Sequence, residues 1–333
     1  MIYLNASDVA AAIGQNRFKT PGDIVKTYWE RANLSKEKRD SQDYELEEDT
    51  SKKLIETIGT QQDKEKYEII LAETEKHKIE KENLILEHTE INKIKLDEVK
   101  NNKELTNKDK AVIVDKLVKE LETTNNNLNN EIKLLETKKR TEIALVNKTI
   151  IETTLDKAVD ENKTELSKEI EKEKVCELKK IVGQDSQEAY KLEKTAKTYI
   201  NTNRGIKGED AIINKYEADR NKKVTDRNSN LYYIDIGEFR IGGKIDGFDK
   251  STNSLVEVKR RRNKLLGLPK YEKIQCEIYM RMLNISNCIH IEEYDGNQKE
   301  RTYISDDRLW KYIEDGLDNF SEYYKSMWKK LNN

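Results

Sequence analysis

The first 35 residues show the apolar spacing of two short helices. Ser7 is predicted to cap the first helix, because its hydroxyl can accept a hydrogen bond from a free backbone N–H, and Gly14 is predicted to end it. Pro21 has the fixed backbone angle of a first helical turn, so a second helix is expected at about residues 22–33. This stretch is expected to belong to a globular domain.

From about residue 36 to residue 200, apolar residues recur at heptad spacing among many charged positions. Residues 60–182 contain no glycine and no proline, the residues least compatible with a helix interior. The heptad positions include Ile70, Leu84, Ile91, Val114, Leu121, Leu128 and Leu135. A period of about 3.5 residues is typical of coiled coils, so residues 36–200 are predicted to form a long α-helical coiled-coil insertion.

Polar residues are predicted to interrupt this insertion at three places. These are Asn101-Asn102, the cap-like Thr106, and the asparagine-rich stretch at residues 123–130. Breaks at these places would let the segment fold back into antiparallel hairpins. Disorder of part of the segment is the alternative, because such a charge density favours solvation over burial.

Glycines and alternating β-branched residues return from about residue 201. The predicted elements are a helix at 207–218, strands near 230–236, 239–248 and 254–261, a helix at 269–283, strands near 287–294 and 300–304, and a helix at 306–330. This order predicts an α/β (α+β) core with a mixed sheet flanked by helices. We therefore expect residues 1–35 and 201–333 to form one core domain that residues 36–200 interrupt.

Composition agrees with a chain that is only partly globular. Charged residues make up 38% and hydrophobic residues 35%, against roughly 25% and 45–50% in typical domains. The formal net charge is only −2, so attraction to nucleic acid would need a local basic cluster. The three cysteines have no CxxC spacing, which argues against a zinc or iron–sulfur site and favours a reducing compartment.

No membrane association is expected from the sequence. No stretch approaches the roughly 18 consecutive apolar residues of a transmembrane helix. The opening residues lack the basic leader and apolar run of a signal peptide. The chain is therefore expected to be intracellular and soluble.

The candidate chemistry lies in the strand predicted near 254–261. Side chains alternate along a strand, so Glu257 and Lys259 share one face while the valines between and beside them enter the core. Asp246 ends the preceding predicted strand, and Gly247 permits a bend beside it. A hairpin between the two strands would bring both carboxylates to one edge of the sheet.

Two carboxylates that converge repel each other, and a divalent cation would remove that cost. Mg²⁺ prefers oxygen ligands, and one or two carboxylates with water and substrate phosphate are its usual set. The backbone carbonyl of Val258 would lie beside Asp246 and Glu257 as a further ligand. Lys259 would then orient or deprotonate the attacking water, or neutralise charge in the transition state of phosphodiester hydrolysis.

Asp246 followed by Glu257-Val258-Lys259 resembles the signature of the PD-(D/E)XK nuclease superfamily, with Ile245 at the position of the proline. A restriction-endonuclease-like core fold is what this resemblance implies. Glu209, in a Gly-Ile-Lys-Gly-Glu stretch predicted to open a helix, resembles the further acidic residue of lambda exonuclease-like enzymes.

Two more stretches resemble this group. Gln275 and Tyr279 lie four residues apart on the predicted helix 269–283, and they resemble a glutamine–tyrosine helix in which the glutamine contacts the catalytic water or the scissile phosphate. The opening Asn5-Ala6-Ser7-Asp8 is similar to that of YqaJ-type viral recombinases, in which the serine contacts a DNA phosphate. The resemblance covers about residues 3–31 and 200–331, and residues 36–200 have no counterpart in it.

Ser7, Arg261 and Tyr279 are the candidate DNA contacts. Strand alternation places Arg261 on the face of Glu257 and Lys259, whereas Arg260 and Arg262 point to the other face. Ser7 as a plain helix cap, and the arginines as a solvated strand end, are the alternatives. The family has an arginine before the serine that binds a 5′-phosphate; residues 1–4 include no basic residue, so another residue would have to take that role.

The resemblance implies a Mg²⁺-dependent (or Mn²⁺-dependent) exonuclease acting on double-stranded DNA with free ends, in recombination or genome processing. Asp246, Glu257 and Val258 would hold the metal, Glu209 and Gln275 would orient water, and Lys259 would assist attack. An endonuclease of the same fold is one alternative, and a coiled-coil DNA-binding scaffold with an inactive nuclease-like domain is another. Self-association or a coiled-coil partner is expected through residues 60–182.

Overall fold

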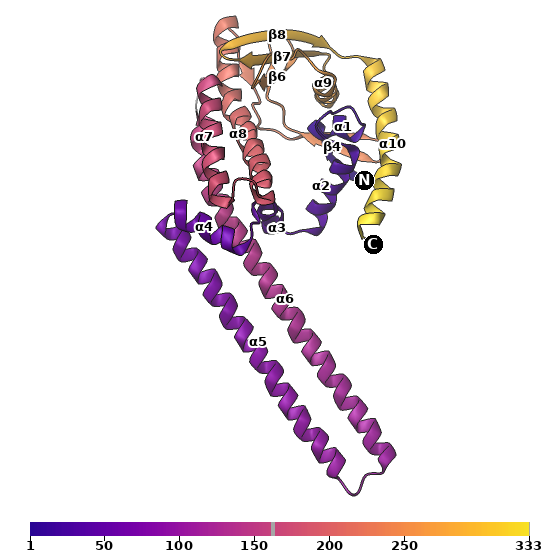
Figure 1. Cartoon of the computed structure of the whole chain (residues 1–333). Helices are drawn as coiled ribbons and strands as arrows, with labels where there is room; N and C mark the ends of the chain where they lie inside the picture. Colours follow the sequence, from indigo (N-terminus) through magenta and orange to yellow (C-terminus); the bar gives the residue numbers. More distant parts are fainter. Residues whose placement is uncertain (161–163, 333) are drawn as a thin grey trace. The chain divides into compact units, whose positions relative to one another are not determined.

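The chain divides into two units in a computed structural model that describes residues 1–160 and 164–332 (Figure 1). The first unit contains Met1–Arg39, Leu155–Val175 and Ala196–Asn333. The second contains Asp40–Thr154 and Cys176–Thr195. Each unit combines segments that are far apart in the sequence.

The second unit is helical. A short helix α3 (Lys36–Ser41) begins in the first unit and is followed by the single-turn η1 (Gln42–Tyr44) and α4 (Glu48–Ile58). Two long helices follow, α5 (Gln61–Asn101) and α6 (Asn107–Asp160), and they form a helical hairpin (Figure 1). The ion pair between Lys81 Nζ and Glu131, at 2.5 Å, joins the two arms. Parts of α7 (Thr164–Val182) and α8 (Gln187–Arg220) complete the unit.

The hairpin turns where two of the three predicted interruptions lie. Asn102 follows the last residue of α5, and the Thr106 hydroxyl accepts from the backbone N–H of Asp109 at 3.2 Å as α6 begins. The predicted break at 123–130 is wrong, because α6 continues through it. Thr123 and Thr124 donate to carbonyls one turn earlier, and exposed asparagines each cost a helix only about 0.7 kcal/mol or less.

The heptad positions differ in their burial. Ile70 and Leu128 are buried. Leu84 and Ile91 remain 38% and 40% exposed. The predicted insertion thus contains long helices whose heptad positions are only partly buried. The coiled coil itself stays a prediction.

The first unit holds two sheets. One has the order β1-β4-β3, formed by Ile2–Asn5, Phe239–Gly243 and Tyr232–Ile236, with β1 parallel to β4. The other has the order β2-β5-β6-β7-β8, formed by Val224–Thr225, Gly247–Asp249, Ser254–Arg260, Asn287–Tyr294 and Asn297–Ile304. Within it only β6 and β7 are parallel, so the predicted mixed sheet is confirmed.

Helices cover both faces of β6. Leu255 packs into a core cluster with Ile274 and Ile278 of α9 (Lys270–Leu283). That cluster also holds residues of α1 (Ala6–Ala12), α2 (Pro21–Asn33) and α10 (Asp307–Asn332). Val256 and Val258 point the other way and pack against residues of α8. A central strand buried on both faces holds its polar residues rigidly, because few rearrangements are open to them.

Several predicted boundaries are wrong. The strand expected at 239–248 is two strands in two different sheets, separated by residues 244–246. The helix expected at 207–218 is the end of the 34-residue α8, which runs through Gly205 and Gly208. Packing of the buried face of α8 stabilises this helix by more than the two glycines destabilise it. The parallel strand β1 is missing from the sequence prediction altogether.

The first helix begins one residue earlier than Ser7. Its N-cap is Asn5, which makes no side-chain capping bond, and Ser7 lies exposed within the first turn. The prediction of Ser7 as the cap is therefore wrong. Gly14 does end this region, with a φ of +71° that only glycine adopts without strain. No helix among the described residues is long and apolar enough to cross a membrane.

Candidate active site

The hairpin of β5 and β6 brings Asp246 beside β6. Gly247 pairs with Val256 in the antiparallel register, so Asp246 stands at the start of β5 opposite the middle of β6. Its Oδ2 atom accepts a hydrogen bond from the backbone N–H of Val258 at 2.8 Å. The carboxylate of Asp246 is therefore fixed on the segment that carries Glu257 and Lys259, as the sequence predicted for the two strands.

Glu257 is completely buried and only half satisfied. One oxygen, Oε1, accepts from Lys259 Nζ at 2.5 Å. The other, Oε2, is buried and has no hydrogen-bond partner in the described part of the chain. An unpartnered buried carboxylate oxygen is costly, so this atom indicates a place where a further positively charged or hydrogen-bonding group belongs.

Burial and the charge of Asp246 raise the pKa of two carboxyl groups at this site, those of Glu257 and Glu209. Burial, and then the charge of Asp246, raises the pKa of Glu257 to about 8 in spite of Lys259. Burial and the charge of Asp246 likewise raise the pKa of Glu209, on α8, to about 7. Desolvation acts to lower the pKa of Lys259, but the charges of Glu257 and Asp246 outweigh it and the net pKa is raised. Lys259 is therefore a permanent cation beside acids that resist ionisation.

Gln275 and Tyr279 stand on α9, at the same site. Tyr279 is buried, and its pKa is raised by desolvation and by the charges of Glu257 and Asp246, against a hydrogen bond from Gln275. A Cβ atom on Gly243 would lie 2.6 Å from the Tyr279 ring, so the glycine leaves room for that ring. Tyr279 is thus close to both carboxylates, and its hydrogen bond places Gln275 beside it.

The donor set fits a divalent cation. Asp246, Glu257 and Glu209 are oxygen donors of the kind that Mg²⁺ prefers, and the free Oε2 of Glu257 lies among acids whose mutual repulsion a cation would relieve. No group of three or more His, Cys, Asp or Glu side chains in the described part of the chain is already arranged to hold a metal. A metal here would thus use two carboxylates together with backbone oxygen, water or substrate oxygen.

Arg261 has a different environment from the one expected. Its guanidinium donates at 2.6 Å to both oxygens of Glu272 and at 2.6 Å to Glu292. The Arg261 side chain is 9% exposed, and those of Glu272 and Glu292 are 4% and 0% exposed. The structure thus engages the charge and the fork of donors of Arg261 inside the protein, which is not the exposed position expected of a DNA contact.

Sequence reasoning missed the partners of Arg261. Glu272, on the buried face of α9, has a pKa of about 2, because the bonds from Arg261 and His290 outweigh its desolvation. His290 lies on β7 in register with Glu257 and is fully buried. An acidic residue on the apolar face of a predicted helix was the signal that could have found Glu272.

Ser7 is exposed on α1, and no described hydrogen bond ties it to the acids. Its neighbour Asp8 is buried. Asp8 accepts from the Tyr28 hydroxyl at 3.1 Å and from Lys19 at 3.3 Å. Ser7 remains a predicted DNA contact.

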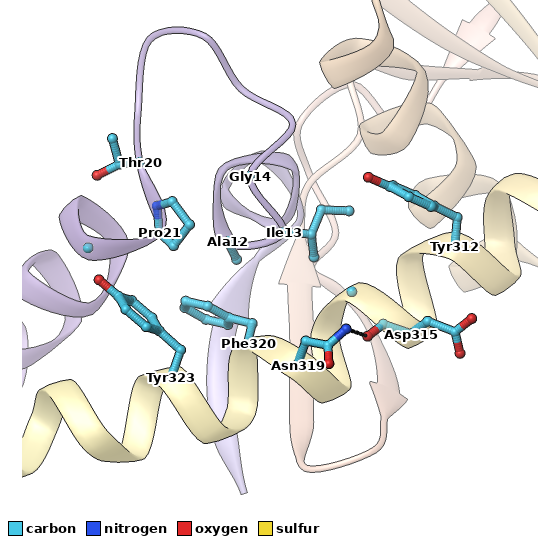
Figure 2. A pocket seen from close by; sticks show the side chains of 12 residues that line it. Ala12, Ile13, Gly14, Thr20, Pro21, Tyr312, Asp315, Asn319, Phe320 and Tyr323 are labelled. Atoms are coloured by element: carbon cyan, nitrogen blue, oxygen red, sulfur yellow. Dashed lines mark hydrogen bonds between the residues drawn. The ribbon is translucent and has the colours of Figure 1, made fainter.

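The first unit also contains two pockets that the candidate site residues do not line. One, of about 530 Å³, lies between the end of α1, the start of α2 and α10, and Figure 2 shows Phe320 and Tyr323 of α10 on one side of it and Pro21 on the other. The second, of about 810 Å³, is lined by residues of β1, α2 and α10. Of the acids, Glu257 lies on β6, Asp246 directly before β5, and Glu209 on α8.

Comparisons of the fold find distant similarity to solved structures. An alkaline exonuclease from Laribacter hongkongensis shares 15% identity, with a TM-score of 0.32, over 55% of this chain and 90% of that chain. The structure of this exonuclease in complex with dAMP gives 15% identity and a TM-score of 0.33, over 54% and 89%. A protein designated SSO0001 gives 13% identity and a TM-score of 0.28, over 52% and 83%.

No protein-family model matches the chain, and no curated protein matches it. With TM-scores of this size, the case for a function rests on the side chains of the site.

Proposed function

We propose that the chain is a metal-dependent deoxyribonuclease of PD-(D/E)XK type. The observation that carries this proposal is the arrangement at β6. Asp246 is bound to the Val258 N–H, while Glu257 is buried with one oxygen on Lys259 and the other unpartnered. Two converging carboxylates with a fixed ammonium form a site that binds a divalent cation and a phosphate oxygen together.

The residues have separate roles in the proposed reaction. Asp246, Glu257 and the Val258 carbonyl would hold Mg²⁺ or Mn²⁺, which supplies Lewis-acid polarisation of a phosphoryl oxygen when bound. Lys259 keeps its proton, since its pKa is raised. It therefore neutralises charge that develops on the phosphate.

Water activation is assigned to the α8 side of the site. Glu209, with a pKa of about 7, can accept a proton from water near neutral pH. Gln275, on α9, orients that water beside the Tyr279 hydroxyl.

An exonuclease that acts from the ends of duplex DNA, in recombination or genome processing, is the form of this proposal that the sequence resemblance favours. The same site would also serve an endonuclease. A third candidate is a coiled-coil scaffold that binds DNA without cleaving it.

Linear and covalently closed plasmid DNA, incubated with Mg²⁺, distinguish these candidates. Loss of the linear form alone supports an exonuclease, and loss of the closed circle supports an endonuclease. Asp246→Asn keeps an oxygen that can accept from the Val258 N–H and removes the charge. It should abolish cleavage, as should Lys259→Ala. Asp235→Asn, an exposed carboxylate paired with Arg240 in the same unit, is the matched control. Absence of cleavage by the wild type with Mg²⁺ and Mn²⁺ would favour the scaffold.

Self-association through residues 60–182 is a further part of this proposal. Apolar side chains that are exposed along the hairpin support it, namely Ile69, Ile79, Leu86, Ile94, Val112, Val118 and Leu134. Sedimentation velocity of the full chain tests it, with Leu86→Lys and Leu134→Lys as the variants. A monomer in the wild type would refute this part alone.

A further inference from the structure

Two arginines of the first unit lie against one buried glutamate, and a third arginine contacts one of them. Glu171, on α7, accepts from Arg262 at 2.6 Å, and its other oxygen lies 3.8 Å from Nη2 of Arg204. Arg204, on α8, donates from Nη2 to the carbonyl of Ala158 at 3.0 Å. Arg260 donates to the carbonyl of Arg204 at 3.4 Å and lies 3.5 Å from Glu293. We call Arg204, Arg260 and Arg262 the arginine cluster.

The arginine cluster has more donors than its surroundings satisfy. Arg204 is 7% exposed, yet its Nε and Nη1 atoms have no hydrogen-bond partner among the residues that the structure describes. Within the same described residues, the Oε2 atom of Glu171, itself 2% exposed, has none either. Burial lowers the pKa of Arg204, and the charges of Arg262 and Arg260 lower it further against Glu171. Three guanidinium groups thus share the carboxylates of Glu171 and Glu293 within the described part of this region.

The arginine cluster adjoins the candidate active site. Arg260 follows Lys259 directly at the end of β6. Its side chain crosses α8 at Gly208, where an added Cβ atom would lie only 2.3 Å from the Cδ atom of Arg260. Gly208 precedes Glu209 on the same helix. A ligand of the arginine cluster would therefore lie beside the strand and helix that carry Lys259 and Glu209.

A phosphate group would satisfy these donors better than the carboxylate does. Guanidinium groups bind phosphate through forked, charge-assisted hydrogen bonds, and a phosphate offers more acceptor positions than a carboxylate. Glu171 accepts a short hydrogen bond from Arg262, at 2.6 Å. Its other oxygen is 3.8 Å from Nη2 of Arg204, which is too far for a hydrogen bond.

We propose that Arg204, Arg260 and Arg262 form a binding site for a backbone phosphate of nucleic acid, which the carboxylate of Glu171 fills when no nucleic acid is bound. The identity of the ligand as nucleic acid rests on the proposed function. Binding exchanges one anion for another at the arginine cluster, so Glu171 competes with the substrate. Removing its charge strengthens binding by more than the loss of a negative charge elsewhere in the unit, whereas for a purely structural ion cluster the two changes would have the same effect.

The test measures binding without cleavage. The full-length chain is titrated onto a fluorescein-labelled DNA duplex of about 20 base pairs in EDTA, and fluorescence anisotropy gives Kd at several salt concentrations. Arg262→Gln should raise Kd roughly tenfold, the size expected for one lost charge-assisted contact, and should reduce the slope of log K against log salt by about 1. Glu171→Gln should lower Kd by several-fold. Arg262→Lys keeps the charge but not the forked pair of donors, so its Kd should lie between the Kd of the wild type and that of Arg262→Gln.

Arg220→Gln and Glu300→Gln are the matched controls, because this pair is a more exposed fork at 3.3 and 3.1 Å in the same unit. Thermal melting of every variant checks that it is folded. Failure of Glu171→Gln to tighten binding, or of Arg262→Gln to weaken it relative to these controls, overturns the proposal. So does the absence of any DNA binding by the wild type, or full displacement of DNA by millimolar inorganic phosphate at constant ionic strength, which would assign the site to free phosphate.

The proposed nuclease activity is tested separately by Asp246→Asn. Cleavage that depends on Asp246, with no effect of Arg262→Gln on binding, would keep the nuclease and remove this site. If Arg262→Gln and Glu171→Gln change DNA binding as expected but the wild type cleaves no DNA, the phosphate site is kept and the nuclease proposal is removed.

Discussion

Replacing Arg261 with glutamine tests whether this arginine is structural. The change removes three hydrogen bonds of 2.6 Å to Glu272 and Glu292 and leaves two buried carboxylates without their cation. Breaking a buried ion pair from one side costs about 3–5 kcal/mol. We therefore expect the free energy of unfolding of the first unit to fall by about that amount.

The size of this effect should depend on pH. The pKa of Glu272 is held at about 2, below its ordinary value. A carboxyl with a depressed pKa contributes stability that is fully present above its unfolded pKa and is lost as the pH falls through the folded value. The difference between wild type and Arg261→Gln should thus be largest near neutral pH and should shrink between about pH 4.5 and pH 2.

Urea unfolding followed by tryptophan fluorescence measures this difference. All three tryptophans, Trp29, Trp310 and Trp328, lie in the first unit, so the signal reports that unit alone. Arg240→Gln is the matched control, since Arg240 forms the same fork with Asp235 at 2.7 and 2.8 Å on the surface. Such an exposed pair is worth about 0–1 kcal/mol. A cost for Arg261→Gln no larger than that of Arg240→Gln would refute the reasoning and would restore Arg261 as a candidate DNA contact.

Two further predictions concern the site and its helix. In EDTA, the raised pKa values of Glu257 (about 8) and Glu209 (about 7) should lower the melting temperature as the pH rises from about 4.5 to about 8. The stability they contribute is fully present below the unfolded pKa of about 4.5 and is lost as the pH rises through the folded values. Mg²⁺ should raise the melting temperature more at about pH 9 than at about pH 6, since it binds the ionised groups, and equal shifts would contradict this. Gly208→Ala should cost about 1–3 kcal/mol by overpacking against Arg260. A Cβ atom on Gly205 would have no atom within 4 Å, so Gly205→Ala should instead stabilise α8 by about 1 kcal/mol. Both variants are measured by urea unfolding, and equal effects on the free energy of unfolding would exclude the contact with Arg260 as the cause.

Local patterns carried the correct predictions at β6. Alternation along one strand is a property of neighbouring residues, so the shared face of Glu257 and Lys259 followed from the sequence. The β5–β6 hairpin is also local, and it placed Asp246 correctly against Val258. The strand β1 could not be found in this way, because its partner β4 lies more than 200 residues away and a four-residue strand has almost no pattern of its own.

Arg261 shows where local reasoning ends. Alternation assigned the correct face of the strand, but it does not say which element covers that face. In the folded chain α9 covers it, and Glu272 takes the charge that was expected to meet DNA. The arginines on the opposite face were set aside for the same reason, because Glu171 and Gly208, which define their surroundings, lie in helices whose packing no local pattern encodes.

The pairing of β1 with β4 has a consequence for synthesis. Ile2 pairs with Phe239, so the first strand leaves the ribosome more than 200 residues before its partner. At about 5–20 residues per second this delay lasts on the order of 10–50 s. During that time the helical hairpin, whose contacts are local, can fold, whereas the core of the first unit cannot close. The nascent chain therefore carries unpaired apolar residues such as Leu4 and Val9 for longer than it needs to form most of its helices, and aggregation during synthesis would begin at that end of the chain.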